Sequence, residues 1–195
     1  MDKNTDKYFD AYLKQFIYST PNEKNFIRKY LSIEKLEKGD FILKSGEVQT
    51  QIGFLYEGLV RRFFIDEQGN EITTGFTKEN EYVTDYPSFI RQISTKYYFQ
   101  CLEPTIMVNL SYEVIQECYK KFKNSEMQGR LVAETVLTIL SDRVESFLFN
   151  TAEERYLKFV KEHPDLMQRV SLTHLASFLG IKRQSLSRIR NKLSK

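Results

Sequence analysis

The side chains best suited to contact another molecule lie near the end of the chain, in a predicted helix that begins at about Lys182. Arg183, Gln184 and Arg188 fall on the outer face of this helix. Arginine donates two hydrogen bonds to guanine or to phosphate, and glutamine bonds adenine in the same bidentate way. No acidic residue occurs from Leu166 onward. The pattern predicts a surface that binds nucleic acid; a solvated basic helix without a partner is the simpler alternative.

A helix-turn-helix pattern must position these side chains. Ser171 is the expected N-cap of a first short helix, Gly180 ends that helix, and the second helix follows. Ala176 is small enough to let the two helices approach closely. The apolar positions that would fill the core between them are Leu175, Leu179, Ile181, Leu186 and Ile189. A solvated basic helix would explain the positive charge, but it would not explain this two-helix spacing.

Charge is divided unevenly along the 195 residues, although the net charge is only +3. From Arg155 to Lys195 there are ten Lys or Arg and two acids, a charge of +8, so residues 1–154 sum to −5. Such asymmetry is typical of a module that neutralises DNA phosphates while the rest of the protein does something else.

Composition bounds the class of protein. A hydrophobic fraction of 41% and a charged fraction of 28% are typical of a folded protein. No apolar run approaches the ~20 residues of a membrane span, and the N-terminal segment lacks a signal-peptide apolar region. We therefore expect a cytoplasmic protein without a membrane partner. Cys101 and Cys118 are too few and too far apart for a metal or iron-sulfur site, so we expect buried thiols, no metal and no cofactor.

The segments before the basic region predict an α+β fold. Helical spacing covers residues 4–18, and Thr20-Pro21-Asn22-Glu23 predicts a capping box and a second helix. Short apolar runs separated by turn signals then predict an antiparallel β-roll between Ile33 and Leu110. The expected strands are FILK, IGFLY, LVRRFFI, EITTGF, Tyr97–Cys101 and Thr105–Leu110. A helix is expected over Tyr112–Phe122.

A long helix is predicted from about Glu126 to Phe149. Steps of four, three, four and three residues join five of its apolar positions, which is the seam of a two-stranded coiled coil. These positions are Ala133, Leu137, Leu140, Val144 and Phe147. Packing of the whole helix within one chain is the alternative to a homodimer. Because Thr151-x-x-Glu154 starts a new helix, we expect a sensor domain over residues 1–125, a dimerisation helix over 126–149 and a DNA-binding domain over 150–195.

This order of elements resembles the cyclic-AMP receptor protein and fumarate-nitrate regulator (Crp/Fnr) family of bacterial transcription factors. The segments that carry the resemblance are EKGDFILKSGE, FLYEGLVRRFFIDEQGNE, AEERYLKFVKEHPDL and SLTHLASFLGIKRQSLSRIRNKL. The resemblance implies a cyclic-nucleotide-binding-like jelly roll flanked by helices, a long dimerisation helix and a C-terminal winged helix-turn-helix. It also implies a homodimer on a pseudo-palindromic double-stranded DNA operator, with RNA polymerase as a further partner of an activator.

The resemblance assigns roles to the basic helix. The family often has an Arg, then an acid, then a second Arg four residues later, and Arg183, Gln184 and Arg188 stand at those places. Gln favours adenine where an acid would accept from cytosine. The remaining expected DNA contacts, mostly to phosphate, are Lys182, Ser185, Ser187, Arg190, Lys192, Ser171 and Thr173. His174 lies beside the last two, although an exposed histidine without a role is equally consistent with the sequence.

The effector pocket departs from the family pattern. Relatives that bind cyclic nucleotides place a Gly-Glu pair, and later an Arg with a small polar neighbour, around the cyclic phosphate and ribose. Here Thr84 and Asp85 stand in place of the first pair, and Thr95 and Lys96 in place of the second. The main phosphate cation is therefore missing.

Nearby residues compensate incompletely for that cation. A shifted Lys96 or Arg91 is a candidate replacement, but Lys lacks the planar fork with which arginine binds phosphate at two points. Tyr82 and Tyr97 add bulk to the expected pocket. We therefore expect an unknown small effector or none. A cyclic-nucleotide-responsive regulator with a rearranged phosphate site is the alternative.

Two other classes of protein fit the sequence less well than a regulator does. A metal-dependent enzyme built on the roll needs histidines and carboxylates inside it, but the two histidines, His163 and His174, follow the roll. The same absence removes the usual haem ligand of the family's haem sensors. A ligand-binding signalling module that acts through protein contacts is disfavoured because the C-terminal face is basic and free of acids.

Overall fold

A computed structural model describes residues 3–193 of the chain. Residues 1–2 and 194–195, the ends of the two outer predicted domains, lie outside the described residues. The chain divides into two compact units. The first runs up to Arg62 and resumes over Phe76–Val136; the second combines Phe63–Gly75 with the chain from Leu137 onward.

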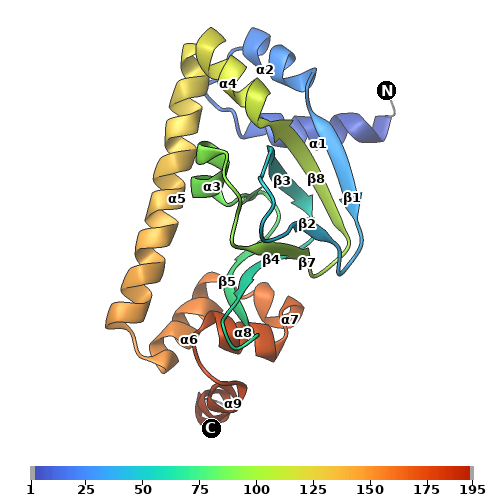
Figure 1. The fold of residues 1–195 in the computed structure, drawn as a ribbon. Helices are drawn as coiled ribbons and strands as arrows, with labels where there is room; N and C mark the ends of the chain where they lie inside the picture. Colours follow the sequence, from blue (N-terminus) through green and yellow to red (C-terminus); the bar gives the residue numbers. More distant parts are fainter. Residues whose placement is uncertain (1–2, 194–195) are drawn as a thin grey trace. The chain divides into compact units, whose positions relative to one another are not determined.

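The first unit holds most of the strands and four short helices (Figure 1). Its elements are α1 (Lys3–Lys14), α2 (Pro21–Arg28), β1 (Ser32–Leu36), β2 (Phe41–Leu43), β3 (Gln51–Glu57), β6 (Tyr82–Val83), α3 (Tyr86–Arg91), β7 (Tyr98–Cys101), β8 (Thr105–Ser111) and α4 (Tyr112–Lys121). Strands β4 (Val60–Ile65) and β5 (Glu71–Thr77) and helix α5 (Lys123–Phe149) each run from one unit into the other. The second unit also holds α6 (Ala152–Glu162), α7 (Leu166–Arg169), α8 (Leu172–Phe178) and α9 (Arg183–Leu193).

The strands form two four-stranded sheets, in the orders β1-β8-β3-β6 and β2-β7-β4-β5. Strand pairs β1–β8, β3–β8, β3–β6 and β2–β7 are antiparallel. The predicted α+β fold with antiparallel sheets and several helices is confirmed.

Alternation along β3 and β8 separates two cores. Phe54 and Val108 point outward and pack with a cluster from α1 that includes Tyr12. Leu55 and Met107, their neighbours in sequence, point inward. There they meet residues of the opposite sheet, Leu43, Phe99 and Cys101. The inward side chains therefore hold the two sheets face to face, while α1 crosses the outer face of β3 and β8 (Figure 1).

One prediction of local structure was wrong, and one short helix was not predicted. The first helix ends at Lys14 rather than near residue 18. The amides of Gln15 and Phe16 donate to the carbonyls three residues back, so the α-helical pattern stops there, well before Thr20 caps α2. Helix α3 was not predicted. It is only six residues long, begins with a proline in its first turn, and ends where Gln92 adopts a left-handed conformation (φ 49°).

The capping box of α2 also links distant segments. Thr20 Oγ1 accepts from the Glu23 amide at 3.3 Å, and Glu23 Oε2 accepts from the Thr20 amide at 3.3 Å. Glu23 is buried, and its other carboxylate oxygen accepts a short hydrogen bond from Ser125 at the start of α5. The cap therefore helps to fix α5 to the roll.

Replacing Thr20 with Ala is expected to lower the free energy of unfolding by about 1 kcal/mol, because a cap acceptor is lost. Urea denaturation followed by circular dichroism measures the change. Ser45→Ala removes an exposed hydroxyl from a surface turn and is the matched control. Equal stability of the two variants would contradict the role given to the cap.

Candidate nucleic-acid interface and effector pocket

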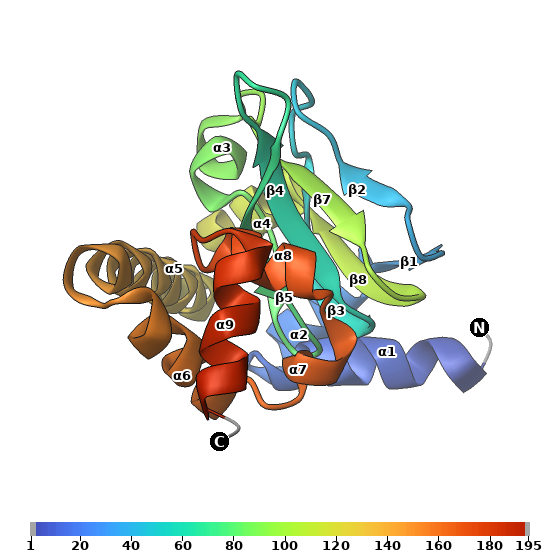
Figure 2. The ribbon, with the colours of Figure 1, turned by 90° about the horizontal axis from the view of Figure 1, so that it is seen from below.

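Helices α8 and α9 pack against each other (Figure 2). The buried side chains of this pair are ones that the sequence spacing selects. Leu175, Leu179 and Leu186 are at most 1% exposed, and Ala176 is 2% exposed. Ser171 caps α8 by accepting from the His174 amide at 3.1 Å. Gly180 has φ +68° and begins the turn. A small apolar core thus fixes the orientation of α9.

The outer face of α9 carries the predicted side chains. Arg183, Gln184 and Arg188 are all exposed, as is Lys182 in the turn before the helix. Ser187 is half-buried and donates from its hydroxyl to the Arg183 carbonyl at 3.2 Å. Of the other predicted contacts, Ser171, Thr173 and Lys192 are exposed and Ser185 and Arg190 are half-buried. The structure therefore places one group of polar side chains together on the α8–α9 pair.

Lys192 differs from the other cations of this face. Its Nζ lies 2.8 Å and 3.0 Å from the two carboxylate oxygens of Glu153 in α6. Both side chains are substantially exposed, so the pair contributes little to stability. The pairing reduces the local positive charge at Lys192, and Lys182 is the better probe of phosphate binding.

A cluster of arginine and phenylalanine side chains holds the end of α8 against α5 and α6. Arg143 donates a short hydrogen bond to the Phe178 carbonyl, and Arg155 Nε donates to the Leu179 carbonyl at 3.0 Å. Both guanidinium groups lie near the Phe147 ring, at 4.4 Å and 4.9 Å from its centre. A Cβ on Gly180 would lie 2.6 Å from this ring. Phe147 therefore has a structural contact in addition to its predicted place in the seam, a contact that the periodicity did not reveal.

In the roll, the structure brings together only part of the predicted effector pocket. Asp85 Oδ2 accepts from Thr95 Oγ1 at 2.7 Å, and both residues are buried. Thr95 Oγ1 also accepts from the Tyr97 amide at 3.0 Å, while the hydroxyl of Thr84 donates to Gln49 at 3.3 Å. The segments around Thr84–Asp85 and Thr95–Lys96, which the resemblance assigns to the pocket, are therefore in contact.

Other residues predicted for this pocket point elsewhere. Arg91 and Lys96 are exposed, and Arg91 Nε donates to the carbonyl of Pro87 in its own helix at 2.9 Å. Tyr82 packs edge-to-face on Tyr12 and Phe54, outside the roll. Because side chains alternate along a strand, its neighbour Val83 faces inward instead.

Arg62 is a cation of the roll interior that the sequence reasoning missed. Its guanidinium carbon lies 5.1 Å from the centre of the Tyr97 ring. Burial lowers the pKa of Arg62, while Tyr97 and Asp85 oppose that shift. The available signal was strand alternation, because Arg62 is two residues after the inward-facing Val60 on β4.

The roll resembles a known family of protein domains. Residues 33–122 match the family model described as cyclic nucleotide-binding domain. The roll is therefore similar to a cyclic nucleotide-binding domain. No curated protein sequence matches the chain.

Solved structures extend the likeness beyond the cyclic nucleotide-binding domain. FixK2 from Bradyrhizobium japonicum is 14% identical with a TM-score of 0.73, covering 84% of each chain. A protein described as a Crp/Fnr family transcriptional regulator from Eubacterium rectale is 16% identical with a TM-score of 0.74, covering 94% of this chain and 87% of that one. The catabolite activator protein of Thermus thermophilus is 17% identical with a TM-score of 0.59, covering 92% of this chain and 86% of that one. These likenesses confirm the fold of Crp/Fnr regulators.

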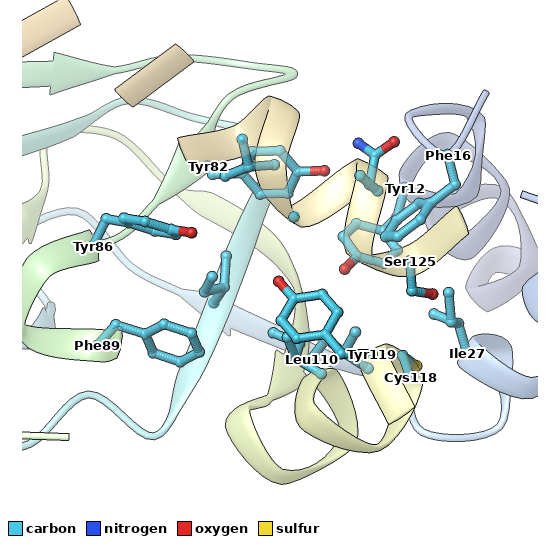
Figure 3. Close-up of a pocket in the computed structure, with 15 residues that line it drawn as sticks. Tyr12, Phe16, Ile27, Tyr82, Tyr86, Phe89, Leu110, Cys118, Tyr119 and Ser125 are labelled. Carbon is cyan, nitrogen blue, oxygen red and sulfur yellow. The ribbon is translucent and has the colours of Figure 1, made fainter. Parts of the chain in front are cut away.

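The roll also has an aromatic cavity on its outer side, of about 60 Å³ (Figure 3). The rings of Tyr86, Phe89 and Tyr119 point toward this space, and Tyr82 lies at its edge. Burial raises the pKa of Tyr119 to about 12, with smaller contributions from Tyr86 and Cys118. Such a volume holds only about two water molecules. We therefore interpret it as a packing gap, with Tyr82 among the side chains that line it.

Within residues 3–193, no helix is both long and apolar enough to cross a membrane. The same residues contain no group of three or more His, Cys, Asp or Glu side chains that could hold a metal ion.

Proposed function

We propose that this protein is a homodimeric, sequence-specific DNA-binding regulator of transcription of the Crp/Fnr type. The α8–α9 pair would form the DNA-reading part of the winged helix-turn-helix that the resemblance implies, with α9 as the recognition helix. The observation that carries the proposal is the outer face of α9, where Arg183, Gln184 and Arg188 are all exposed in a segment without acidic residues.

The exposed stripe on α5 supports a homodimer. Leu137 is 67% exposed and Val144 58% exposed, while Leu140 and Phe147 are also exposed. Ala133 is half-buried. Burial of large apolar side chains against a second copy is the usual way to stabilise such a helix. The proposed boundaries remain residues 1–125, 126–149 and 150–195.

Each protomer would then set α9 into one major groove of a pseudo-palindromic operator. The two grooves lie about 34 Å apart along the DNA. Phosphate contacts by Lys182, Ser185 and Arg190 would supply most of the affinity, while the exposed side chains of α9 select bases. Ser171 and Thr173 would reach the phosphate backbone from the start of α8.

The effector is proposed to differ from cyclic AMP. Thr95 stands where the resemblance puts the arginine of the phosphate site, and its hydroxyl donates to Asp85 instead, so this position carries no arginine for a cyclic phosphate. Arg62 favours the alternative, a rearranged phosphate site, because it brings a cation near Tyr97. Selection of operator sequences from random DNA, with and without cyclic AMP, distinguishes the two. Enrichment that requires cyclic AMP would support the alternative.

Replacing Arg188 with Ala is expected to weaken operator binding by about 1–3 kcal/mol and to relax preference at one base pair. Lys182→Ala is the matched control, because a lost phosphate contact weakens operator and random DNA alike. Fluorescence anisotropy titrations on both kinds of DNA measure the difference. Equal losses on operator and random DNA for Arg188→Ala would contradict its base-reading role.

The salt dependence of the same titrations tests DNA binding itself. Release of counterions from phosphate makes affinity fall steeply as salt rises. A DNA affinity that did not change with salt concentration would instead favour a signalling module that acts through protein contacts.

A further inference from the structure

A second cavity, of about 330 Å³, lies in the roll between β2, β3, β6 and β8. Its inner wall is formed by buried residues, including Gly53, Met107 and Asn109. Exposed residues of the loop after β2, Val48 and Thr50, stand at its outer edge. The volume falls in the range typical of sites for small molecules. Thr84, Asp85, Thr95 and Lys96 are not among the lining residues, although Gln49 on the wall accepts hydrogen bonds from Thr84 and Asp85.

The amide of Asn109 leaves one acceptor unused at this cavity. Asn109 is 2% exposed, and its Nδ2 donates to Glu34 Oε2 at 2.8 Å. Its Oδ1 is buried and has no hydrogen-bond partner among the described residues. Turning the amide over would place Oδ1 against the Glu34 carboxylate, so the orientation is fixed by charge. A buried carbonyl oxygen of this kind favours a donor from outside the protein.

Gly53 provides the space beside that oxygen. It stands directly opposite Asn109 in the β3–β8 register. A Cβ at Gly53 would lie 2.9 Å from Asn109 Oδ1 and 2.8 Å from Met107 Sδ. Any side chain here would fill the cavity next to the free acceptor, so the glycine keeps it open.

Gln49, the other buried amide on the wall, is fully engaged by the protein. Its Nε2 donates to the carbonyls of Gln51 and Val83 at 2.9 Å and 3.1 Å. Its Oε1 accepts from the Asp85 amide at 2.9 Å. Gln49 therefore shapes the wall, and Asn109 is left to select the ligand.

The charge of the lining excludes an anion. None of the residues that line the cavity is Lys, Arg or His, and Glu47 is the ionisable one among them. The Glu34 carboxylate lies directly behind Asn109. A phosphate or carboxylate ligand would lie against hydrogen-bond acceptors and negative charge, whereas an N–H donor would satisfy the unused acceptor, Asn109 Oδ1.

We propose that this cavity binds a small uncharged or cationic molecule that donates an N–H group to Asn109 Oδ1. The apolar body of the ligand, about the size of a single aromatic ring with one polar group, packs against Leu43, Val83 and Met107. The proposal goes beyond DNA binding and does not depend on it, because every residue in it belongs to the roll.

Three probes of similar size and different charge test the proposal: benzamide, benzamidine and benzoate. Saturation-transfer NMR on the full chain is expected to show saturable binding of benzamide and benzamidine, but not of benzoate. Asn109→Leu removes the acceptor and should weaken both bound probes about tenfold. Val48→Trp blocks the outer edge and should abolish binding, while Ile90→Trp, on α3, leaves it unchanged.

Several outcomes would overturn the proposal. If neither benzamide nor benzamidine bound at millimolar concentration, water alone would occupy the site beside Asn109. Benzoate that bound as tightly as benzamidine would contradict the predicted charge preference. Unchanged probe binding by Val48→Trp would show that the probes bind elsewhere. Thermal melting of each variant shows whether it folds. If Asn109→Leu does not fold, Val48→Trp still tests the proposal, because Val48 lies at the exposed edge of the cavity. Anisotropy with DNA, measured without probes, reports separately on the proposed function.

Discussion

Replacement of Leu137 and Val144 together by glutamate is expected to convert the protein to monomers and to lower operator affinity by about 10²–10⁴-fold. These side chains are 67% and 58% exposed, so neither is needed to fill the core of one chain. Charges facing one another across the seam would repel and would lose apolar burial. The affinity falls steeply because the second recognition helix no longer binds as part of one molecule.

Sedimentation velocity measures the oligomeric state, and anisotropy measures operator affinity. Thr135→Glu with Thr138→Glu adds the same charge to the same helix away from the seam, so it should leave both quantities nearly unchanged. A dimer that survived Leu137→Glu with Val144→Glu would place the interface elsewhere. A monomer that kept full operator affinity would show that pairing along α5 is not needed for binding.

The α8–α9 pair was predictable because its signals are local. Ser171 caps the first helix and Gly180 ends it, both within a few residues of the bonds they control. Leu175 and Leu186 are eleven residues apart, and helical spacing alone places both on facing surfaces. By contrast, the bond between Lys192 and Glu153 joins residues 39 positions apart, and no local pattern could indicate it.

The interior of the roll was less predictable because it depends on strand register. Gly53 and Asn109 form one wall only because β3 and β8 pair with those two residues opposite each other. A shift of one residue along a strand reverses inward and outward positions. That is why Tyr82 was predicted to line the pocket but packs outside, while Arg62 was missed although it is directed inward.

Replacement of Leu186 with Ala is expected to destabilise the α8–α9 pair by about 2–5 kcal/mol, a large share of the ~5–15 kcal/mol that stabilises a typical domain. Leu186 is 0% exposed, and its neighbours Leu175 and Leu179 are each 1% exposed, so truncation leaves a cavity that their packing cannot easily close. Urea denaturation should show the loss, and operator binding should fall at temperatures where the pair unfolds.

Leu193→Ala is the control, because Leu193 on the same helix is 42% exposed and its truncation should cost much less. The oligomeric state of Leu186→Ala should be unchanged, since the seam on α5 does not include this residue. If Leu186→Ala kept normal stability, the contact between α8 and α9 would not be the core that orients the basic face. If it lost stability but kept operator affinity at every temperature, DNA would have to be bound by another surface.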